Sequence, residues 1–422
     1  MDKFVIDGGR RLRGTVVVNG SKNAALPILT ATLLTDEPCL LDNVPRLRDI
    51  RTTVRLLETL GKRVVFRGKT VVVLPGRRLR TRAPYDLVKQ MRASVLVIGP
   101  LLARFGRARA ALPGGCAIGL RPVDIHLAGF VALGARERTE GGDVILEGAL
   151  KPGRVRLRLP SVGATENLMM AAAAVPGETV IENAAREPEI ADLGRFLTAL
   201  GARVIGAGTP RVRVHGARRL HGARHRVIPD RIEAGTYLIA CAAAGADVRL
   251  VGSEPRHLKA VIEALRRSGA EVKQESKENN PRAALRLRMT GRPRPVSIRT
   301  RPHPGFPTDL QAPWMAYMSL AAGRSRIRED IFERRFLHAA ELIRMGADIA
   351  VAERTAVVNG VSELRGAPVM ASDIRAGAAL IVAALAARGE SEIHRIYHID
   401  RGYERIERVL RGLGARIRRA KA

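Results

Sequence analysis

The chain has 422 residues, of which 46% are hydrophobic, 27% charged and only 3% aromatic, a composition typical of a globular protein with two or three domains. Its net charge is +31, yet the arginines are spread along the whole chain and aromatic side chains that could stack on bases are scarce, which disfavours a dedicated nucleic-acid-binding surface. The longest uncharged apolar run, residues 376–387, is too short to span a membrane, and the N-terminus lacks the apolar stretch of a signal peptide, so we expect a cytoplasmic protein.

A leucine-rich helix that ends in glycine and runs into a strand recurs along the chain. The terminal glycines lie 67 to 77 residues apart, at Gly61, Gly134, Gly201, Gly269, Gly346 and Gly414. Glycine after the last helical turn is the usual residue of a left-handed cap, and the β-branched run after it predicts a strand. Most of these helices follow a short strand, which in turn follows an alanine-rich helix such as residues 166–175 or 235–245. Helices of small apolar residues with little polar patterning are expected to be buried on all sides.

These repeats predict an α/β fold of six helix-strand-helix-strand units, three in each of two similar lobes. The least periodic stretch, residues 216–233, is where we place the boundary between the lobes. We expect residues 22–229 to form the first lobe, and residues 1–21 with 230–422 to form the second. Ligand sites commonly lie between lobes, so the functional site is expected in the cleft between them.

The first predicted helix begins within residues 18–29, where Ser21, Lys22 and Asn23 precede an apolar run. Ser21 or Asn23 could cap this helix while Lys22 points toward the cleft. A lysine at a helix start is a plausible anion site, because the free N–H groups and the helix dipole favour negative charge. Taken alone, an ordinary capped helix is the stronger interpretation.

The three cysteines, Cys39, Cys116 and Cys241, are an odd number at wide spacing, so neither a disulfide framework nor a zinc site is expected. Cys39 lies in a strand-like segment and Cys241 in a helix-like segment, and both are interpreted as buried core thiols. Only Cys116 lies in a glycine-rich loop, where Arg121 favours its thiolate. Such a cysteine can act as a nucleophile or a general acid, although an ordinary surface turn is an equally good interpretation.

The fifth unit contains residues 301–314, with four prolines that stiffen the loop and with Asp309 at the start of a helix. Asp309 could be a helix cap or a general base, and its spacing alone favours the cap. In the sixth unit Arg375 and Arg401 open their helices, where the macrodipole disfavours cations. Arginine in such a place suggests a nearby carboxylate or an anionic ligand.

Other enzyme classes find no support in the sequence. The chain has no GxGxxG after a strand, no GxxxxGK[ST], no HExxH and no CxxC. Nucleotide hydrolysis by a P-loop, dinucleotide redox chemistry and zinc catalysis are therefore not indicated.

Several loop motifs, taken in order, resemble those of the UDP-N-acetylglucosamine 1-carboxyvinyltransferase family of enolpyruvyl transferases. They include "GSKNAALPIL", "QMRAS", "LPGGCAIGLRPVDIH", "PSVGATEN", "FPTDLQA", "SDIRAGAAL" and "YHIDRGYERIE", and the resemblance extends from about residue 4 to residue 418. It implies two inside-out α/β barrel lobes. It also implies transfer of the enolpyruvyl group of phosphoenolpyruvate to the 3-hydroxyl of UDP-N-acetylglucosamine with release of phosphate, the first committed step of peptidoglycan synthesis. No metal or organic cofactor and no nucleic-acid or membrane partner is implied.

The resemblance also implies roles for individual residues. Cys116 would be the proton donor, and the target of the epoxide antibiotic fosfomycin, while Asp309 would be the general base, with Lys22 and Arg401 also catalytic. Phosphoenolpyruvate would be bound by Lys22, Asn23, Arg121, Arg335, Arg375 and Arg401. The sugar nucleotide would contact Arg92, Arg121, Pro122, Val123, Asp124, Ile125, Leu159, Pro160, Ser161, Val162, Asp309 and Ile331.

Three alternatives differ from this interpretation. The related 3-phosphoshikimate 1-carboxyvinyltransferases share the architecture but lack the cysteine loop and the sugar-nucleotide motifs. A basic nucleic-acid-binding repeat protein would fit the net charge of +31 but explains neither Cys116 nor the loop motifs. A degenerate regulatory relative would keep the fold, but every named site residue is intact.

Overall fold

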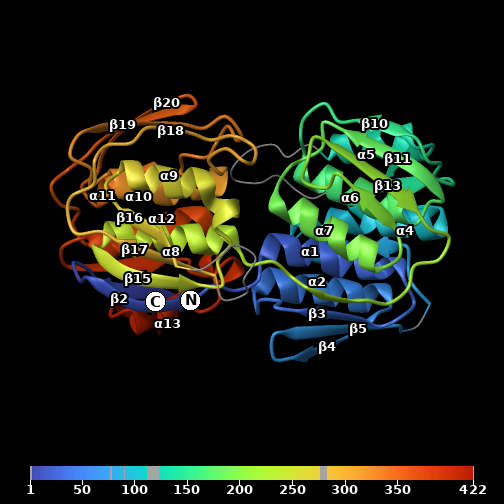
Figure 1. The fold of residues 1–422 in the computed structure, drawn as a ribbon, viewed down its shortest axis with the longest axis horizontal. Helices are drawn as coiled ribbons and strands as arrows, with labels where there is room; N and C mark the ends of the chain where they lie inside the picture. The colour runs from blue at the N-terminus through green and yellow to red at the C-terminus, as the bar shows by residue number, and fades with distance from the viewer. Residues whose placement is uncertain (1, 77, 90, 112–122, 276–282, 422) are drawn as a thin grey trace. The chain divides into compact units, whose positions relative to one another are not determined.

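The computed structural model describes residues 2–76, 78–89, 91–111, 123–275 and 283–421 (Figure 1). They form two compact units, and the chain passes from one to the other between Asn19 and Gly20 and returns between Ile228 and Pro229. We call the unit from Gly20 to Ile228 the middle unit. The terminal unit is the unit that contains both ends of the chain. No helix in the described ranges is long and apolar enough to cross a membrane.

In the middle unit the described residues form seven α-helices and three four-stranded sheets. The helices are α1 (Lys22–Ala31), α2 (Arg48–Leu60), α3 (Tyr85–Val88), α4 (Ile98–Phe105), α5 (Asp124–Ala132), α6 (Val162–Ala173) and α7 (Pro188–Ala199). The first sheet, in the order β14-β3-β5-β4, contains Arg224–Arg226, Cys39–Asp42, Thr70–Leu74 and Arg63–Arg67. The second, β6-β7-β9-β8, contains Arg82–Ala83, Arg107–Ala111, Asp143–Glu147 and Arg136–Glu140. The third, β10-β11-β13-β12, contains Arg154–Arg156, Gly177–Glu182, Arg211–Gly216 and Arg203–Ile205.

The described part of the terminal unit has six α-helices and three more sheets of four strands. Its helices are α8 (Arg231–Ala243), α9 (Lys259–Arg267), α10 (Gln311–Met318), α11 (Ala339–Arg344), α12 (Ile374–Ala386) and α13 (Ile406–Gly412). The sheet β16-β17-β15-β2 contains Glu271–Gln274, Ala284–Arg288, Ala246–Val251 and Leu12–Val17. The sheet β18-β19-β21-β20 contains Ile298–Arg299, Arg324–Arg328, Thr355–Asn359 and Asp348–Ala352. The sheet β22-β23-β1-β24 contains Pro368–Met370, Glu390–His394, Asp2–Asp7 and Arg416–Lys421.

All six sheets follow one plan, with one parallel strand pair at one edge and two antiparallel pairs after it. The sequence predicts this sixfold repetition with three copies in each half, and the structure confirms it. The six glycines that end the recurring helices have φ values of 113°, 100°, 111°, 101°, 91° and 96°, in chain order from Gly61 to Gly414. Only glycine adopts this conformation without strain, so the regular spacing has a backbone cause.

In each unit the alanine-rich helices fill the interior and the sheets lie outside them (Figure 1). Helices α8, α10 and α12 pack against one another in the terminal unit, and eleven of the thirteen residues of α8 are buried. Small residues allow this close approach: a Cβ at Gly235 would lie 2.3 Å from Leu310 Cδ1. Cys39 and Cys241 are buried, as expected, and burial raises the pKa of Cys241 to about 12.

One sheet brings together the two ends of the described chain. Strand β1 lies between β23 and β24, and Asp2 is directly opposite Lys421. The next strand, β2, pairs with β15. Both N-terminal strands therefore belong to sheets whose other strands come after residue 228.

Candidate active site

An aspartate held by two arginines is the centre of the site in the terminal unit. Asp309 lies in the short helix η4 (Thr308–Leu310), directly before α10. Its Oδ1 accepts a hydrogen bond of 2.7 Å from Arg335 Nη2, and its Oδ2 accepts one of 2.9 Å from Arg375 Nη2. Asp309 is the N-cap of neither η4 nor α10, so the cap interpretation is wrong. The carboxylate is instead fixed between two cations.

Arg375 is held by its neighbours on more than one side. Asp373 caps α12 by accepting from the backbone N–H of Arg375 at 2.8 Å, which orients the start of the helix. Arg375 Nη1 donates a hydrogen bond to Tyr403 Oη at 3.1 Å, and Tyr403 Oη also lies 2.9 Å from Thr236 Oγ1. Burial opposes the charge of this guanidinium, but Asp309 and Tyr403 outweigh it and raise the pKa of Arg375. The cation is therefore permanent and pre-positioned.

Arg335 is also buried, with 5% of its surface exposed. Its guanidinium carbon lies 5.6 Å from the centre of the Phe332 ring, and its Nε has no hydrogen-bond partner within the described residues. His338, three residues further on, is 2% exposed, and burial lowers its pKa to about 4, with the charge of Arg335 acting in the same direction. Arg335 thus keeps a buried donor available beside the carboxylate.

The buried carboxylate of Glu329 ties together two segments of the site. Its Oε2 accepts from Thr308 Oγ1 at 2.9 Å, next to Asp309 in the chain. Its Oε1 accepts from the backbone N–H groups of Ile331 and Phe332 at 2.8 and 3.1 Å. Glu329 is therefore a positioning residue for both the aspartate and the predicted sugar-nucleotide contact at Ile331. Arg401, at the end of η5 (Ile399–Arg401), is half-buried in the same unit, two residues before Tyr403.

The middle unit places a second buried cation at a helix start. Ser21 caps α1, with its Oγ accepting from the N–H of Ala24 at 3.3 Å, which confirms one of the two predicted caps. Lys22, the first residue of α1, is 7% exposed, and its Nζ lies 3.1 Å from Asp49 Oδ2 in the first turn of α2. Asn23 follows it on the same turn and is half-buried.

Two helix starts that the resemblance assigns to the sugar nucleotide lie together in the middle unit. Asp124 opens α5, and its Oδ2 lies 2.7 Å from Nη2 of Arg158, which precedes the segment Leu159–Val162. Ser161 caps α6 by accepting from the N–H of Ala164 at 3.3 Å. Deeper in the unit, His126 of α5 and Asn167 of α6 are joined by a 3.1 Å hydrogen bond.

Exposure differs along these two segments. Leu159 is 52% exposed and Asp124 is exposed, whereas Ile125 is buried, and Val123, Pro160, Ser161 and Val162 are half-buried. A surface of exposed apolar and charged groups over two helix N-termini can bind a large anionic ligand. Cys116, Arg121 and Pro122 lie outside the described residues, as does the side chain of Arg92.

Three residues that hold the predicted groups in place were missed by sequence reasoning: Asp49, Glu329 and Tyr403. Each is a polar or charged residue that the structure buries. Tyr403 lies within the quoted motif "YHIDRGYERIE" but was given no role there, and Asp49 and Glu329 lie in no quoted motif. The partners that reveal their roles are 21 to 28 residues away in the chain. Within the described ranges, no cluster of three or more His, Cys, Asp or Glu side chains is arranged to hold a metal ion.

The chain is similar to known proteins over nearly its whole length. Residues 6–410 match the family described as EPSP synthase (3-phosphoshikimate 1-carboxyvinyltransferase). A protein of Nitratidesulfovibrio vulgaris named UDP-N-acetylglucosamine 1-carboxyvinyltransferase is 54% identical and covers 99% of both chains. A protein of Trichlorobacter lovleyi with the same name is 52% identical, again over 99% of both chains.

Solved structures show the same fold. The enolpyruvyl transferase NikO from Streptomyces tendae has a TM-score of 0.89 at 26% identity and covers 100% of this chain and 99% of its own. An EPSP synthase from Acinetobacter baumannii has a TM-score of 0.77 at 19% identity over 100% of both chains, which shows the fold alone. The chain therefore belongs to the enolpyruvyl transferase family, and its half-identical relatives within that family are UDP-N-acetylglucosamine 1-carboxyvinyltransferases.

Proposed function

We propose that this chain transfers the enolpyruvyl group of phosphoenolpyruvate to the 3-hydroxyl of UDP-N-acetylglucosamine and releases phosphate, in the cytoplasm, as a step of peptidoglycan synthesis. The relatives at 52–54% identity carry the name of this activity over 99% of the chain. The single structural observation that supports it best is the position of Asp309 between two buried arginines, Arg335 and Arg375. We also propose that residues 22–229 and residues 1–21 with 230–422 are the two lobes.

The cations suit the charge of phosphoenolpyruvate, which carries a phosphate and a carboxylate. Buried guanidinium groups held by fixed partners stabilise such an anion without reorganising when it binds. The proposed contacts are Lys22, Asn23, Arg121, Arg335, Arg375 and Arg401. Since this set draws on both units, the proposed reaction requires side chains of both.

The two arginines also control the base. While they bind Asp309, their charges make its carboxylate a weak proton acceptor. An incoming carboxylate or phosphate competes for Arg335 and Arg375, and each hydrogen bond that moves to the substrate makes Asp309 more basic. The binding of phosphoenolpyruvate to the two arginines therefore activates the base that deprotonates the sugar hydroxyl.

The proposed chemistry is addition followed by elimination. Asp309 takes the proton of the sugar hydroxyl while the hydroxyl oxygen bonds to C2 of phosphoenolpyruvate. Cys116 gives a proton to C3. The bond from C2 to the phosphate oxygen then breaks and the phosphate leaves with the proton that Asp309 had taken. The Cys116 thiolate takes a proton back from C3, and the double bond forms again. We place the sugar nucleotide against Arg92, Arg121 to Ile125, the segment Leu159 to Val162, Asp309 and Ile331.

One assay tests this function against its nearest rival. The protein is mixed with phosphoenolpyruvate and either UDP-N-acetylglucosamine or shikimate 3-phosphate, and inorganic phosphate is measured. We expect release only with the sugar nucleotide, and loss of that release in Cys116→Ala but not in Cys241→Ala, whose thiol is buried in α8. Release with shikimate 3-phosphate, or none with either acceptor, would refute the proposal.

A further inference from the structure

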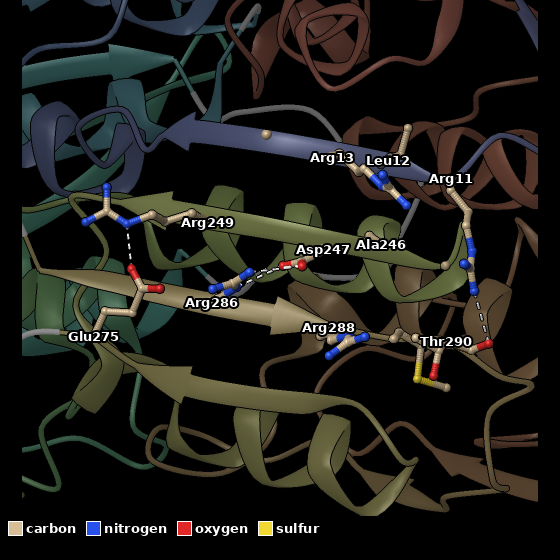
Figure 2. Close-up of a pocket in the computed structure, with 13 residues that line it drawn as sticks. Arg11, Leu12, Arg13, Ala246, Asp247, Arg249, Glu275, Arg286, Arg288 and Thr290 are labelled. Atoms are coloured by element: carbon tan, nitrogen blue, oxygen red, sulfur yellow. Dashed lines mark hydrogen bonds and ion pairs between the residues drawn. The ribbon is translucent and has the colours of Figure 1, made fainter.

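A groove of about 520 Å³ lies on the exposed side of the sheet β16-β17-β15-β2 in the terminal unit (Figure 2). Its charged lining consists of five arginines, Arg11, Arg13, Arg249, Arg286 and Arg288, and two acids, Asp247 and Glu275. None of these residues is among those proposed for the transfer reaction. The groove is therefore a strongly positive surface that the proposed function leaves unexplained.

Two of the five arginines are neutralised by the two acids. Arg286 makes a two-pronged ion pair with Asp247, with distances of 2.9 Å from Nε to Oδ1 and 3.0 Å from Nη2 to Oδ2. The hydrogen bonds from Arg286 lower the pKa of Asp247. Arg249 donates from Nε to Glu275 Oε2 at 2.5 Å. Both carboxylates of the lining are thus already engaged.

The other three arginines lie together at one end of the groove (Figure 2), and none of them forms an ion pair with an acid of the described residues, although Glu271 on β16 is directly opposite Arg288. Arg11 donates only to the backbone oxygen of Thr290, at 3.3 Å. Arg13 on β2 and Arg288 on β17 are both directly opposite Asp247, one on each side of β15. Residues directly opposite one another project from the same side of a sheet, so both side chains rise beside a carboxylate that Arg286 occupies.

A neighbouring cross-strand row also contains cations: Arg249 on β15 and Lys273 on β16 are each directly opposite Arg286 on β17. Each of the three is paired with an acid, Arg249 with Glu275, Arg286 with Asp247 and Lys273 with Glu271. The positive excess of the groove therefore lies at Arg11, Arg13 and Arg288.

We propose that this groove binds a small polyphosphate anion, held chiefly by Arg11, Arg13 and Arg288. The forked guanidinium donors match phosphate oxygens in pairs, and several exposed arginines around one hollow concentrate the positive potential there. A linear chain of phosphates can reach from Arg13 across β15 to Arg288, a path that a single phosphate group would not fill. The site is independent of the transfer reaction.

Isothermal titration of the full chain with tripolyphosphate tests this site. We expect one saturable event that weakens by about tenfold or more in Arg13→Gln with Arg288→Gln, because two charge-assisted hydrogen-bonding groups are lost. The matched control is Arg63→Gln with Arg67→Gln, which removes the same charge from exposed positions on β4 and should change the affinity less than about twofold. Both double variants leave the transfer residues intact, so any binding at those residues persists in both.

The outcomes separate cleanly. Equal affinity in the parent and in Arg13→Gln with Arg288→Gln would overturn the proposal, as would no measurable binding by the parent. An equal loss in both double variants would show that only the overall charge matters, and so would duplex DNA binding that falls equally in both. Arg288→Gln alone, with its unfolding midpoint measured, guards against a folding defect in the double variant. Phosphate release from the transfer assay is expected to be unchanged in all of them.

Discussion

At the scale of single residues, the proposed chemistry depends on buried charges that hold one another in place. Asp309 gains two guanidinium partners that lie 26 and 66 residues away in the chain. The sequence identifies Asp309 and Arg375 within quoted motifs and Arg335 through the family resemblance. It favours a helix cap for Asp309 because the partners are brought to it only by folding. Tyr403 and Glu329 were missed for the same reason. Their partners are set by tertiary contacts, and no spacing rule marks them.

Asp309→Asn tests the role of the carboxylate. We expect kcat to fall by about 10²- to 10⁴-fold, since an amide cannot accept the proton. Asp143→Asn is the matched control, because Asp143 is likewise shared by two arginines, Arg82 and Arg109, in the middle unit. Steady-state phosphate release measures both. Comparable losses in the two variants would show that the effect is structural.

His338 predicts a dependence of stability on pH. Its pKa is lowered from 6.5 to about 4 in the folded state. Between these two pH values His338 is therefore protonated in the unfolded chain but neutral in the folded chain. Stability is therefore lost as the pH falls from 6.5 toward 4, by about 2 kcal/mol between pH 7 and pH 5. The free energy of unfolding, measured by urea at pH 7 and at pH 5, should therefore fall less between these pH values in His338→Gln than in the parent protein. The half-buried His215, changed to Gln, is the control and should keep this dependence, and an unchanged pH dependence of stability in His338→Gln would contradict the prediction.

At the scale of elements, the glycine that ends each recurring helix defines the repeat. This glycine can be predicted from the sequence because the requirement is local: a left-handed backbone at one position accepts only glycine without strain. The pairing of the strands is harder to predict. Strand β14 pairs with β3 across more than 180 residues, and the exact register comes from the packing of the buried faces.

Gly346→Ala isolates the backbone requirement. Gly346 has a φ of 91°, and a Cβ there would have nothing within 4 Å, so strain is the only cost. We expect a loss of about 1–2 kcal/mol in the free energy of unfolding. Gly291→Ala is the control, because a Cβ there also meets nothing within 4 Å and its φ is not positive. Equal unfolding midpoints in urea for the two variants would argue against the cap.

At the scale of the whole molecule, the described residues form two hydrophobic cores that share no residue. One core draws only on the terminal unit and the other only on the middle unit. The sequence predicts this division from repetition alone, since three similar units close around their own buried helices. What it does not predict is which side chains fill each core, because that depends on the shape of the space left between helices.

Separate cores predict separate unfolding. Phe196 is fully buried in the core of the middle unit, and Phe196→Ala should cost that unit about 3–5 kcal/mol. Trp314, the single tryptophan, lies in the core of the terminal unit and reports on it by fluorescence. We expect the hydrogen exchange of middle-unit peptides to accelerate in Phe196→Ala while the fluorescence midpoint in urea stays where it was. A joint shift of both signals would mean that the chain unfolds as one cooperative body.

The position of β1 between β23 and β24 has a consequence for how the protein is made. Translation makes β1 and β2 before the middle unit, but their partners are made after it: β15 for β2, and β23 and β24 for β1. The described strands of the middle unit pair only with one another, so this unit can reach its native state on the nascent chain before the partners of β1 and β2 have been made. During translation we therefore expect the middle unit to fold before β1 and β2 pair, although both strands are made before it.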